Sequence, residues 1–241
     1  MERLDKFLAS QNFGTRKEVT ALVKSGAVTV GGEVVRDSAR KLDPLRDEVA
    51  VLGKTVTYQK HVYLMMNKPA GVLCATEDSR QETVLDLLPP ELARRGLFPA
   101  GRLDKDTTGL LILTDDGDFA HRMLAPKSHV YKLYQAEVER PITQADIEAF
   151  EAGIKSGTQQ FAPARLWGEG KTAFVEIREG KFHQVKRMFL AVGNRVLTLK
   201  RLKIGGLALD ETLPLGGVRP LTEAEVTQIF SSNCIKIHDS V

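Results

Sequence analysis

The segment that decides the fold of this chain is GRLDKDTTGLLILTDDG, residues 101–117. It joins a polar loop bracketed by glycines to the apolar run Leu110–Leu113, which is too short for a helix and is bounded by turn residues. We therefore expect a buried strand behind a rigidly held loop, and such loops commonly carry reactive side chains. Asp104 lies on this loop between Arg102 and Lys105, and a nearby cation favours the ionised carboxylate. An ionised, oriented aspartate can act as a nucleophile, a base or a metal ligand.

This loop has three interpretations. The first is a polar turn that leads into a core strand. The second is a calcium loop, since positions one, three, five, six and twelve of an EF-hand pattern are filled by Asp104, Asp106, Thr108, Gly109 and Asp115. That pattern requires glutamate at its twelfth position and an entering helix, which Pro99 and Gly101 oppose. The third interpretation is an enzyme active site.

The whole segment resembles the active-site motif of pseudouridine synthases, which is G-R-L-D followed by Thr or Ser, Gly and an apolar run. The resemblance implies that Asp104 is the catalytic aspartate and that the reaction needs no cofactor and no metal. A second element of that superfamily, Asn-Lys-Pro-x-Gly, matches residues 67–71, directly after a predicted buried strand at 62–66. A Lys-x-Tyr element matches residues 132–134 on a predicted strand, and the resemblance implies that Tyr134 stacks on the uracil. Without the resemblance, packing in a sheet would explain Tyr134.

A third element of the resemblance lies in the basic run at residues 181–189, where a His-Gln-apolar-basic pattern sets one cation against the catalytic aspartate. By position, the resemblance implies that this cation is Lys186, which offers a point charge and not a planar fork. The alternative is that Lys186 binds an RNA phosphate, as Arg187 would. An apolar helical face is predicted for Val185, Met188 and Phe189.

Length and composition describe a globular protein of one or two domains, with 241 residues, 42% hydrophobic and 27% charged. No apolar run approaches the ~18 residues of a membrane span, and the N-terminus has no signal-peptide core. Cys74, Cys234 and five scattered histidines have neither zinc-site spacing nor a disulfide framework. We therefore expect a cytoplasmic, monomeric protein without membrane association.

Positive charge is concentrated in two regions, although the net charge is only +3. Residues 1–60 contain 11 Lys/Arg against 8 Asp/Glu, and residues 181–203 contain seven Lys/Arg and no acid. A solvated surface usually mixes both signs, so the second region predicts phosphate binding.

Residues 1–58 are predicted to form a small module of two helices and a hairpin. A capping box at Thr15 and Glu18 starts the second helix, Gly26 ends it, and Gly31-Gly32 forms the hairpin turn before a last strand at 48–52. The pattern resembles the S4 RNA-binding domain. The resemblance implies RNA contacts from Arg3, Arg16, Lys17 and Lys24. The alternatives are an ion pair between Arg3 and Asp5, and simple solubility for Lys17.

Residues 59–61 are the predicted linker, and residues 62–241 the predicted catalytic domain. Its further helices are expected at 83–88, 118–124, from Thr143, and at 222–230. Its further strands are expected at 161–167, 173–177 and 195–204, the last with outward cations at Lys200, Arg201 and Lys203. These elements predict an α+β fold with a mostly antiparallel mixed sheet flanked by helices.

The order of all these elements resembles small-subunit ribosomal RNA pseudouridine synthases of the RsuA type. The resemblance implies conversion of one uridine in 16S rRNA, that at position 516, either in free RNA or in a small-subunit assembly intermediate. Arg102 is the candidate to fill the place in the base stack that the target leaves. The alternatives are a synthase that acts on 23S rRNA and a ribosome-assembly protein that binds RNA without catalysis. A pure binder has no need of an anionic Asp104 facing phosphate.

Overall fold

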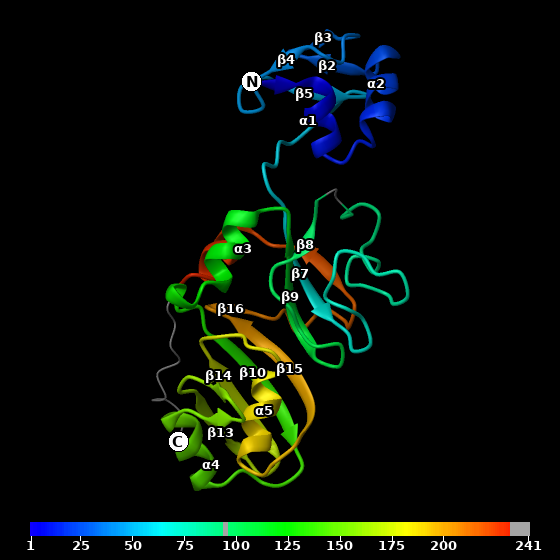
Figure 1. The fold of residues 1–241 in the computed structure, drawn as a ribbon. Coiled ribbons are helices and arrows are strands. Elements are labelled where there is room, and N and C mark those ends of the chain that lie inside the picture. The colour runs from blue at the N-terminus through cyan, green and yellow to red at the C-terminus, as the bar shows by residue number, and fades with distance from the viewer. Residues whose placement is uncertain (94–95, 232–241) are drawn as a thin grey trace. The chain divides into compact units, whose positions relative to one another are not determined.

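The computed structural model describes residues 1–93 and 96–231, which divide into two compact units (Figure 1). The first comprises Met1–Val62 together with Pro89–Leu97, and the second comprises Tyr63–Leu88 together with the described residues from Phe98 onward. Each unit has its own hydrophobic core. Domain boundaries at residues 58 and 62, with a linker between them, remain a prediction.

The first unit is built from short elements around a small apolar core. Its helices are α1 (Leu4–Ser10) and α2 (Arg16–Lys24). Its strands are β1 (Glu2–Arg3), β2 (Val28–Val30), β3 (Glu33–Val34), β4 (Lys41–Leu42), β5 (Val49–Val51) and β6 (Lys54–Thr55). One antiparallel sheet has the order β3-β2-β5-β6, and β1 pairs separately with β4.

Local sequence accounts for these elements. The Thr15 hydroxyl accepts from the Glu18 N–H while the Glu18 carboxylate accepts from the Thr15 N–H, which confirms the predicted start of α2. Gly31-Gly32, both at positive φ, form the predicted turn between β2 and β3. The prediction that the strand at 48–52 is the last one was wrong. Leu52-Gly53 also adopt positive φ and turn the chain back, so that β6 extends the sheet.

The second unit is organised around one large sheet. Its helices are α3 (Gly117–Leu124), α4 (Gln144–Ala152), α5 (Gln184–Ala191) and α6 (Glu223–Gln228), with a 3-10 turn at Pro126–Ser128. Its strands are β7 (Tyr63–Lys68), β8 (Phe98–Pro99), β9 (Thr108–Thr114), β10 (Lys132–Val138), β11 (Lys155–Ser156), β12 (Gln159–Gln160), β13 (Arg165–Glu169), β14 (Thr172–Ile177), β15 (Val196–Ile204), β16 (Leu207–Ala208) and β17 (Val218–Pro220).

The main sheet has the strand order β13-β14-β10-β15-β9-β7-β17. Its described neighbours pair antiparallel, except for the parallel pair β15–β9. The predicted α+β architecture with a mostly antiparallel sheet is therefore confirmed. The helices that the sequence predicted at residues 118–124, from Thr143 and at 222–230 correspond to α3, α4 and α6.

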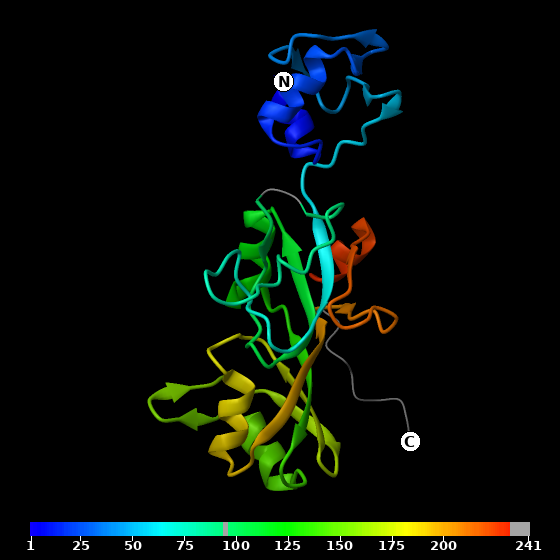
Figure 2. The same cartoon turned by 90° about the vertical axis from the view of Figure 1, so that its right-hand side faces the viewer.

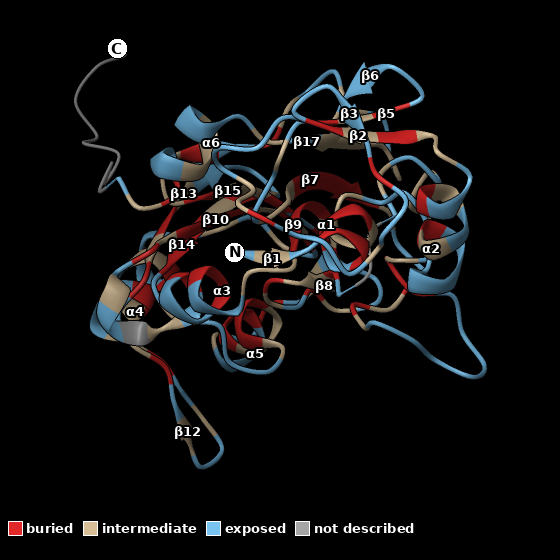
Figure 3. Cartoon of the chain, turned by 90° about the horizontal axis from the view of Figure 1, so that it is seen from above, coloured by how far each residue is buried: buried red, intermediate tan, exposed pale blue. Residues whose placement is uncertain are grey.

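Strands β9 and β7, next to the edge strand β17, are buried along nearly their whole length (Figure 3). Residues on both strands join α3 in one core cluster that includes Met65, Leu110 and Phe119. Helix α5 lies across β10, β14 and β15, beside the projecting hairpin β11–β12 (Figures 1 and 2). Its predicted apolar face is buried. The sheet thus supports the Asp104 loop from one strand and α5 from its neighbours.

Two predicted elements are wrong. Residues 83–88 form turns and no helix. Thr83 bridges to Leu73, the next backbone bonds span only three residues, from Asp86 N to Thr83 O and from Leu88 N to Leu85 O, and Pro89-Pro90 end the segment. Residues 161–164 precede β13 and do not belong to it. Their backbone N–H groups bond instead to the segment around α4, Phe161 to Ile154 O and Ala164 to Phe150 O.

No helix within residues 1–93 and 96–231 is long and apolar enough to cross a membrane. Cys74 is a buried free thiol, and Cys234 lies outside the described residues. In that same part of the chain, no group of three or more His, Cys, Asp or Glu side chains could hold a metal ion. The calcium interpretation of the Asp104 loop fails on its flanks, since strand β8 precedes the loop and strand β9 follows it.

Candidate active site

The buried side chain of Lys68 holds the loop that carries Asp104 by hydrogen bonds. This lysine is fully buried at the end of β7. Its ammonium donates to three carbonyl oxygens at 2.9, 3.2 and 3.1 Å, those of Pro69, Lys105 and Thr107. Burial lowers the pKa of Lys68. The motif at residues 67–71 therefore fixes the shape of the Asp104 loop, although the two segments are distant in sequence.

Gly109 marks the point where the loop passes into the sheet. Its φ is +100°, and a Cβ there would clash with the carbonyl oxygen of Arg201 on β15. Glycine therefore permits the close parallel pairing of β9 and β15. On the same side, Arg201 Nε donates to Leu110 O at 2.8 Å. The glycine of the motif is thus explained by backbone packing.

Asp104 is paired with Lys186 on α5, and Lys186 is shared with a second carboxylate. Lys186 Nζ lies 3.0 Å from Asp104 Oδ2 and 2.5 Å from Asp106 Oδ1. Burial lowers the pKa of Lys186, but its hydrogen bonds to Asp106 and Asp104 outweigh burial and leave that pKa raised. The hydrogen bond from Lys186 also lowers the pKa of Asp106. Asp106 was not predicted as a partner of Lys186, although it lies two residues after Asp104 in the motif.

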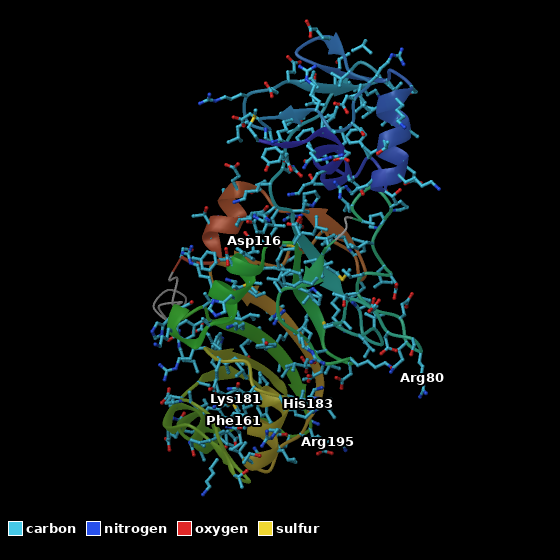
Figure 4. All side chains as sticks on the ribbon, turned by 45° about the horizontal axis from the view of Figure 1, so that its top comes forward. Arg80, Asp116, Phe161, Lys181, His183 and Arg195 are labelled. Carbon is cyan, nitrogen blue, oxygen red and sulfur yellow. The ribbon has the colours of Figure 1, made fainter. Side chains whose placement is uncertain are left out.

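The Asp104 carboxylate has a second neighbour in His183. His183 Nε2 lies 3.5 Å from Asp104 Oδ1. This histidine is the N-cap residue of α5 in the left-handed conformation, with φ 50°. Figure 4 shows His183 next to Lys181 of the same turn. The side chain of Asp104 remains 24% exposed, so a ligand can reach the carboxylate.

Asp104 is one of the residues that line a pocket within the second unit. Arg102 and Asp104 line it from the loop, Tyr134 from β10, and Leu199 from β15. The turn before α5 and the first residues of α5 complete the wall at 180–181 and 183–185. Tyr134 is only 7% exposed, and its ring is held by the sheet. The pocket therefore combines a carboxylate, a cation next to it and a flat aromatic side chain.

Arg201 was predicted to point outward, and this prediction was wrong. The residue is only 4% exposed, and its Nη1 lies 3.5 Å from the Tyr134 hydroxyl oxygen. Its Nη2 is buried without a hydrogen-bond partner. A bulge between β10 and β15 shifts the register here. Leu199 and Ile204 are both buried although they lie five positions apart, which a regular alternating strand does not allow, so the bulge accounts for the buried Arg201 between them.

Lys132 was noticed only as part of the Lys-x-Tyr element, yet it is 6% exposed. Burial and the nearby charge of Arg201 lower its pKa to about 8. Within the described residues, no carboxylate lies in ion-pair range of Lys132 or Arg201. In the described part of the chain, the sheet next to the pocket therefore holds buried positive charge without a paired carboxylate.

The other predicted binding residues differ in their surroundings. Arg102 is exposed at the pocket. Arg187 is half-buried, donates to Ser156 O at 3.1 Å and lies over the ring of Phe161 at 5.1 Å, away from the pocket lining.

In the first unit, Arg3 and Arg16 both contact Asp5, with nitrogen–oxygen distances of 2.8 and 3.4 Å. The ion pair considered as an alternative for Arg3 is therefore present. Lys17 and Lys24 are exposed on α2.

Comparison with known proteins gives matches in both units. Residues 62–191 match the family model of RNA pseudouridylate synthases, and residues 2–49 match the model of the S4 domain. An uncharacterized RNA pseudouridine synthase of Bacillus subtilis, YtzG, is 50% identical over 230 residues, which cover 93% of this chain and 96% of that protein.

Ribosomal small subunit pseudouridine synthase A is 46% identical in Vibrio cholerae, over 95% of this chain and 99% of that protein. The Escherichia coli protein of the same name is 42% identical, over 94% and 99%. A crystal structure of a pseudouridylate synthase aligns with a TM-score of 0.66 at 37% identity, over 95% of this chain and all of that chain.

Proposed function

This chain belongs to the RNA pseudouridylate synthase family, and we propose that its substrate is one uridine of 16S ribosomal RNA, that at position 516. The small-subunit part of the proposal is supported by the two relatives named for that subunit, which align over nearly their whole length. The proposed working form is a cytoplasmic monomer that meets the RNA free or in an assembling particle.

The reaction is an isomerisation. The N1–C1′ bond breaks, the base turns, and a C5–C1′ bond forms, while C5 loses a proton and N1 gains one. A base inside a stack cannot turn, so the nucleotide must leave the stack and enter a pocket. The pocket beside Asp104 is lined by the groups that such a reaction needs.

Asp104 has the central chemical role in this proposal. Its carboxylate either attacks C1′ directly or abstracts a sugar proton to give an unsaturated intermediate. Both routes require an ionised carboxylate that can reach the sugar, and the exposed fraction of Asp104 at the pocket supports this. No step requires a cofactor.

Lys186 keeps Asp104 ionised and oriented. Support comes from the 3.0 Å contact and from the raised pKa of Lys186, which keeps this ammonium charged at neutral pH. Because a lysine is a point charge, it can serve Asp104 and Asp106 together without the planar geometry of a guanidinium.

Tyr134 offers its ring to the face of the uracil, and stacking of a base on an aromatic side chain contributes about 1–3 kcal/mol. Arg102, exposed at the mouth of the pocket, takes the place in the stack that the target nucleotide leaves. Arg187 contributes positive charge near α5. Residues 1–58 form the S4 domain, in which Arg3, Arg16, Lys17 and Lys24 contact RNA. The match of residues 2–49 to the S4 model supports this assignment.

The proposal is tested by incubating the purified protein with free 16S rRNA, free 23S rRNA and assembling small-subunit particles. Carbodiimide-dependent primer extension then maps new pseudouridines. We expect one new stop in 16S rRNA, in the free RNA or in the particle. Modification confined to 23S rRNA would contradict the choice of subunit, and absence of modification in all three would contradict the proposed substrate.

A further inference from the structure

Phe182 is a large apolar side chain that the structure leaves in water. It is 74% exposed, although both of its sequence neighbours, Lys181 and His183, line the pocket beside Asp104. Its ring stacks on the imidazole of His183, with 3.8 Å between the ring centroids and 18° between the ring planes. One face of the Phe182 ring is therefore covered by His183, and its high exposure leaves the other face open.

The turn that presents this ring pair is held firmly by Gln184, which is itself buried. Gln184 Oε1 accepts from the Lys181 N–H at 3.0 Å, and Gln184 Nε2 donates to Glu179 Oε1 at 2.9 Å. The Lys181 ammonium is drawn away from Phe182, because it donates to Gln160 O and pairs with Glu179. The open ring face is therefore preformed and is not covered by the neighbouring lysine.

The surroundings of the ring pair are suited to RNA. Lys181, Lys186 and Arg187 lie within five residues of Phe182 in sequence, and His183 bridges the ring to the reacting carboxylate at 3.5 Å. A uridine that leaves its stack to reach Asp104 also exposes the face of the base next to it. Exposed bases in single-stranded RNA are commonly bound by stacking on aromatic side chains.

We propose that the Phe182–His183 ring pair is a stacking platform for the nucleobase adjacent to the target uridine. This inference rests on the proposed function and adds a binding subsite outside the catalytic pocket. The platform binds any base by its flat face, so it strengthens binding next to the target without reading sequence. It also fixes the strand on the side of His183, so that the everted nucleotide meets Asp104.

The first test compares Phe182→Ala, Phe182→Leu and Phe182→Trp in the full-length enzyme. The RNA is a fragment of unmodified 16S rRNA that contains position 516, and binding is followed by fluorescence anisotropy. Loss of one stacked base predicts a fall in affinity of roughly 5- to 100-fold for the alanine and leucine variants. The tryptophan variant should bind as the native enzyme does. The control is Leu190→Ala, which removes another exposed apolar side chain, 67% exposed, from α5, and should leave affinity unchanged.

The second test identifies the occupant by a double-mutant cycle with RNA that carries an abasic site next to the target. The abasic site should weaken binding to the native enzyme as much as Phe182→Ala does, and should cost nothing further in that variant. Three results would each contradict the proposed platform. Phe182→Ala could bind RNA as tightly as the native enzyme, Phe182→Leu could keep full affinity, or the abasic site could weaken binding to Phe182→Ala as much as it weakens binding to the native enzyme. Binding does not depend on turnover, so failure of the native enzyme to modify RNA would count against the proposed function separately.

Discussion

The tripeptide Arg-Leu-Asp occurs once in each unit of this enzyme, and the two copies have opposite surroundings. At residues 3–5 the arginine binds its own aspartate through two nitrogens, at 3.1 and 2.8 Å, and Arg16 adds a third contact. At residues 102–104 the described structure shows no ion pair between Arg102 and Asp104. There the aspartate is paired with Lys186 of a distant helix and faces a pocket.

The two aspartates therefore differ in their partners and in their access to solvent, although both stand in the sequence Arg-Leu-Asp-Lys. Asp5 is 5% exposed and satisfied, and the hydrogen bond from Arg3 outweighs burial and lowers its pKa to about 2. It stabilises the start of α1. Asp104 keeps an accessible carboxylate and leaves Arg102 free to contact a ligand. The cations differ as well: the half-exposed Arg3 pairs with a carboxylate, whereas the buried Lys132 and Arg201 near the pocket have no carboxylate partner among the described residues.

Among changes that keep Asp104 in place, Lys186→Met should have the largest effect, because it removes the partner that distinguishes Asp104 from Asp5. Removing one positioned charge from a reaction centre typically costs roughly 100- to 1,000-fold in rate, and we expect that loss in single-turnover pseudouridine formation. Lys186→Arg should retain part of the rate because the charge remains. The matched control is Lys171→Met, which removes an exposed lysine outside the pocket lining and should leave the rate unchanged. Equal rates for Lys186→Met and the native enzyme would show that Lys186 has no role in the reaction.

Lys132→Met tests whether the second unit really buries an uncompensated charge. The folded pKa of about 8 lies below the usual 10.5, so the unfolded chain binds more protons between these values and native stability rises with pH across that window. The methionine variant should lack this rise. It should be more stable at pH 7 by about 1–3 kcal/mol, measured by urea unfolding.

The control for this change is Lys171→Met, at an exposed position, which should alter stability by less than about 0.5 kcal/mol. A pH-independent difference between Lys132→Met and the native enzyme would show that Lys132 is not buried as a charge.

Asp5→Asn tests the other side of the comparison and should have the smallest effect. The lowered pKa of Asp5 gives stability that is present above its usual pKa of 3.8 and is lost as the pH falls through about 2. Because the two arginines are half exposed, solvent screens the pairs, and we expect a loss of about 1–2 kcal/mol at pH 7 that shrinks between pH 4 and pH 2. Turnover per bound RNA should not change, and a loss of turnover would mean that the two aspartates are not separate in function.

Local signals in the sequence predicted most of the fold. Capping boxes at Thr15 and Thr143 and the turn at Gly31-Gly32 are made by residues within a few positions of one another, so their geometry follows from the sequence alone. The buried strand β9 also follows from its apolar run and its bounding turn residues. The expected helix at 83–88 was wrong, because Thr83 bridges to the distant Leu73 and Pro89-Pro90 stop the chain after a single turn.

The site was only partly predictable because several of its contacts join distant segments. The motifs indicated Asp104, Tyr134 and Lys186, and their roles stay predictions. The burial of Arg201 depends on a bulge in the pairing of β10 with β15, and the anchoring of the loop by Lys68 depends on carbonyl groups nearly 40 residues later. Neither contact can be predicted from the residues around Arg201 or around Lys68 alone.

The central claim is that the Asp104 carboxylate reacts at the sugar of an everted uridine. Its most direct test is Asp104→Asn, with tritium release from C5-labelled RNA and RNA affinity measured on the same sample in single turnover. We predict a loss of release of roughly 10,000-fold or more, with affinity within about threefold of the native enzyme. Release within tenfold of the native rate would contradict the account, as would a loss of release explained fully by a loss of RNA binding.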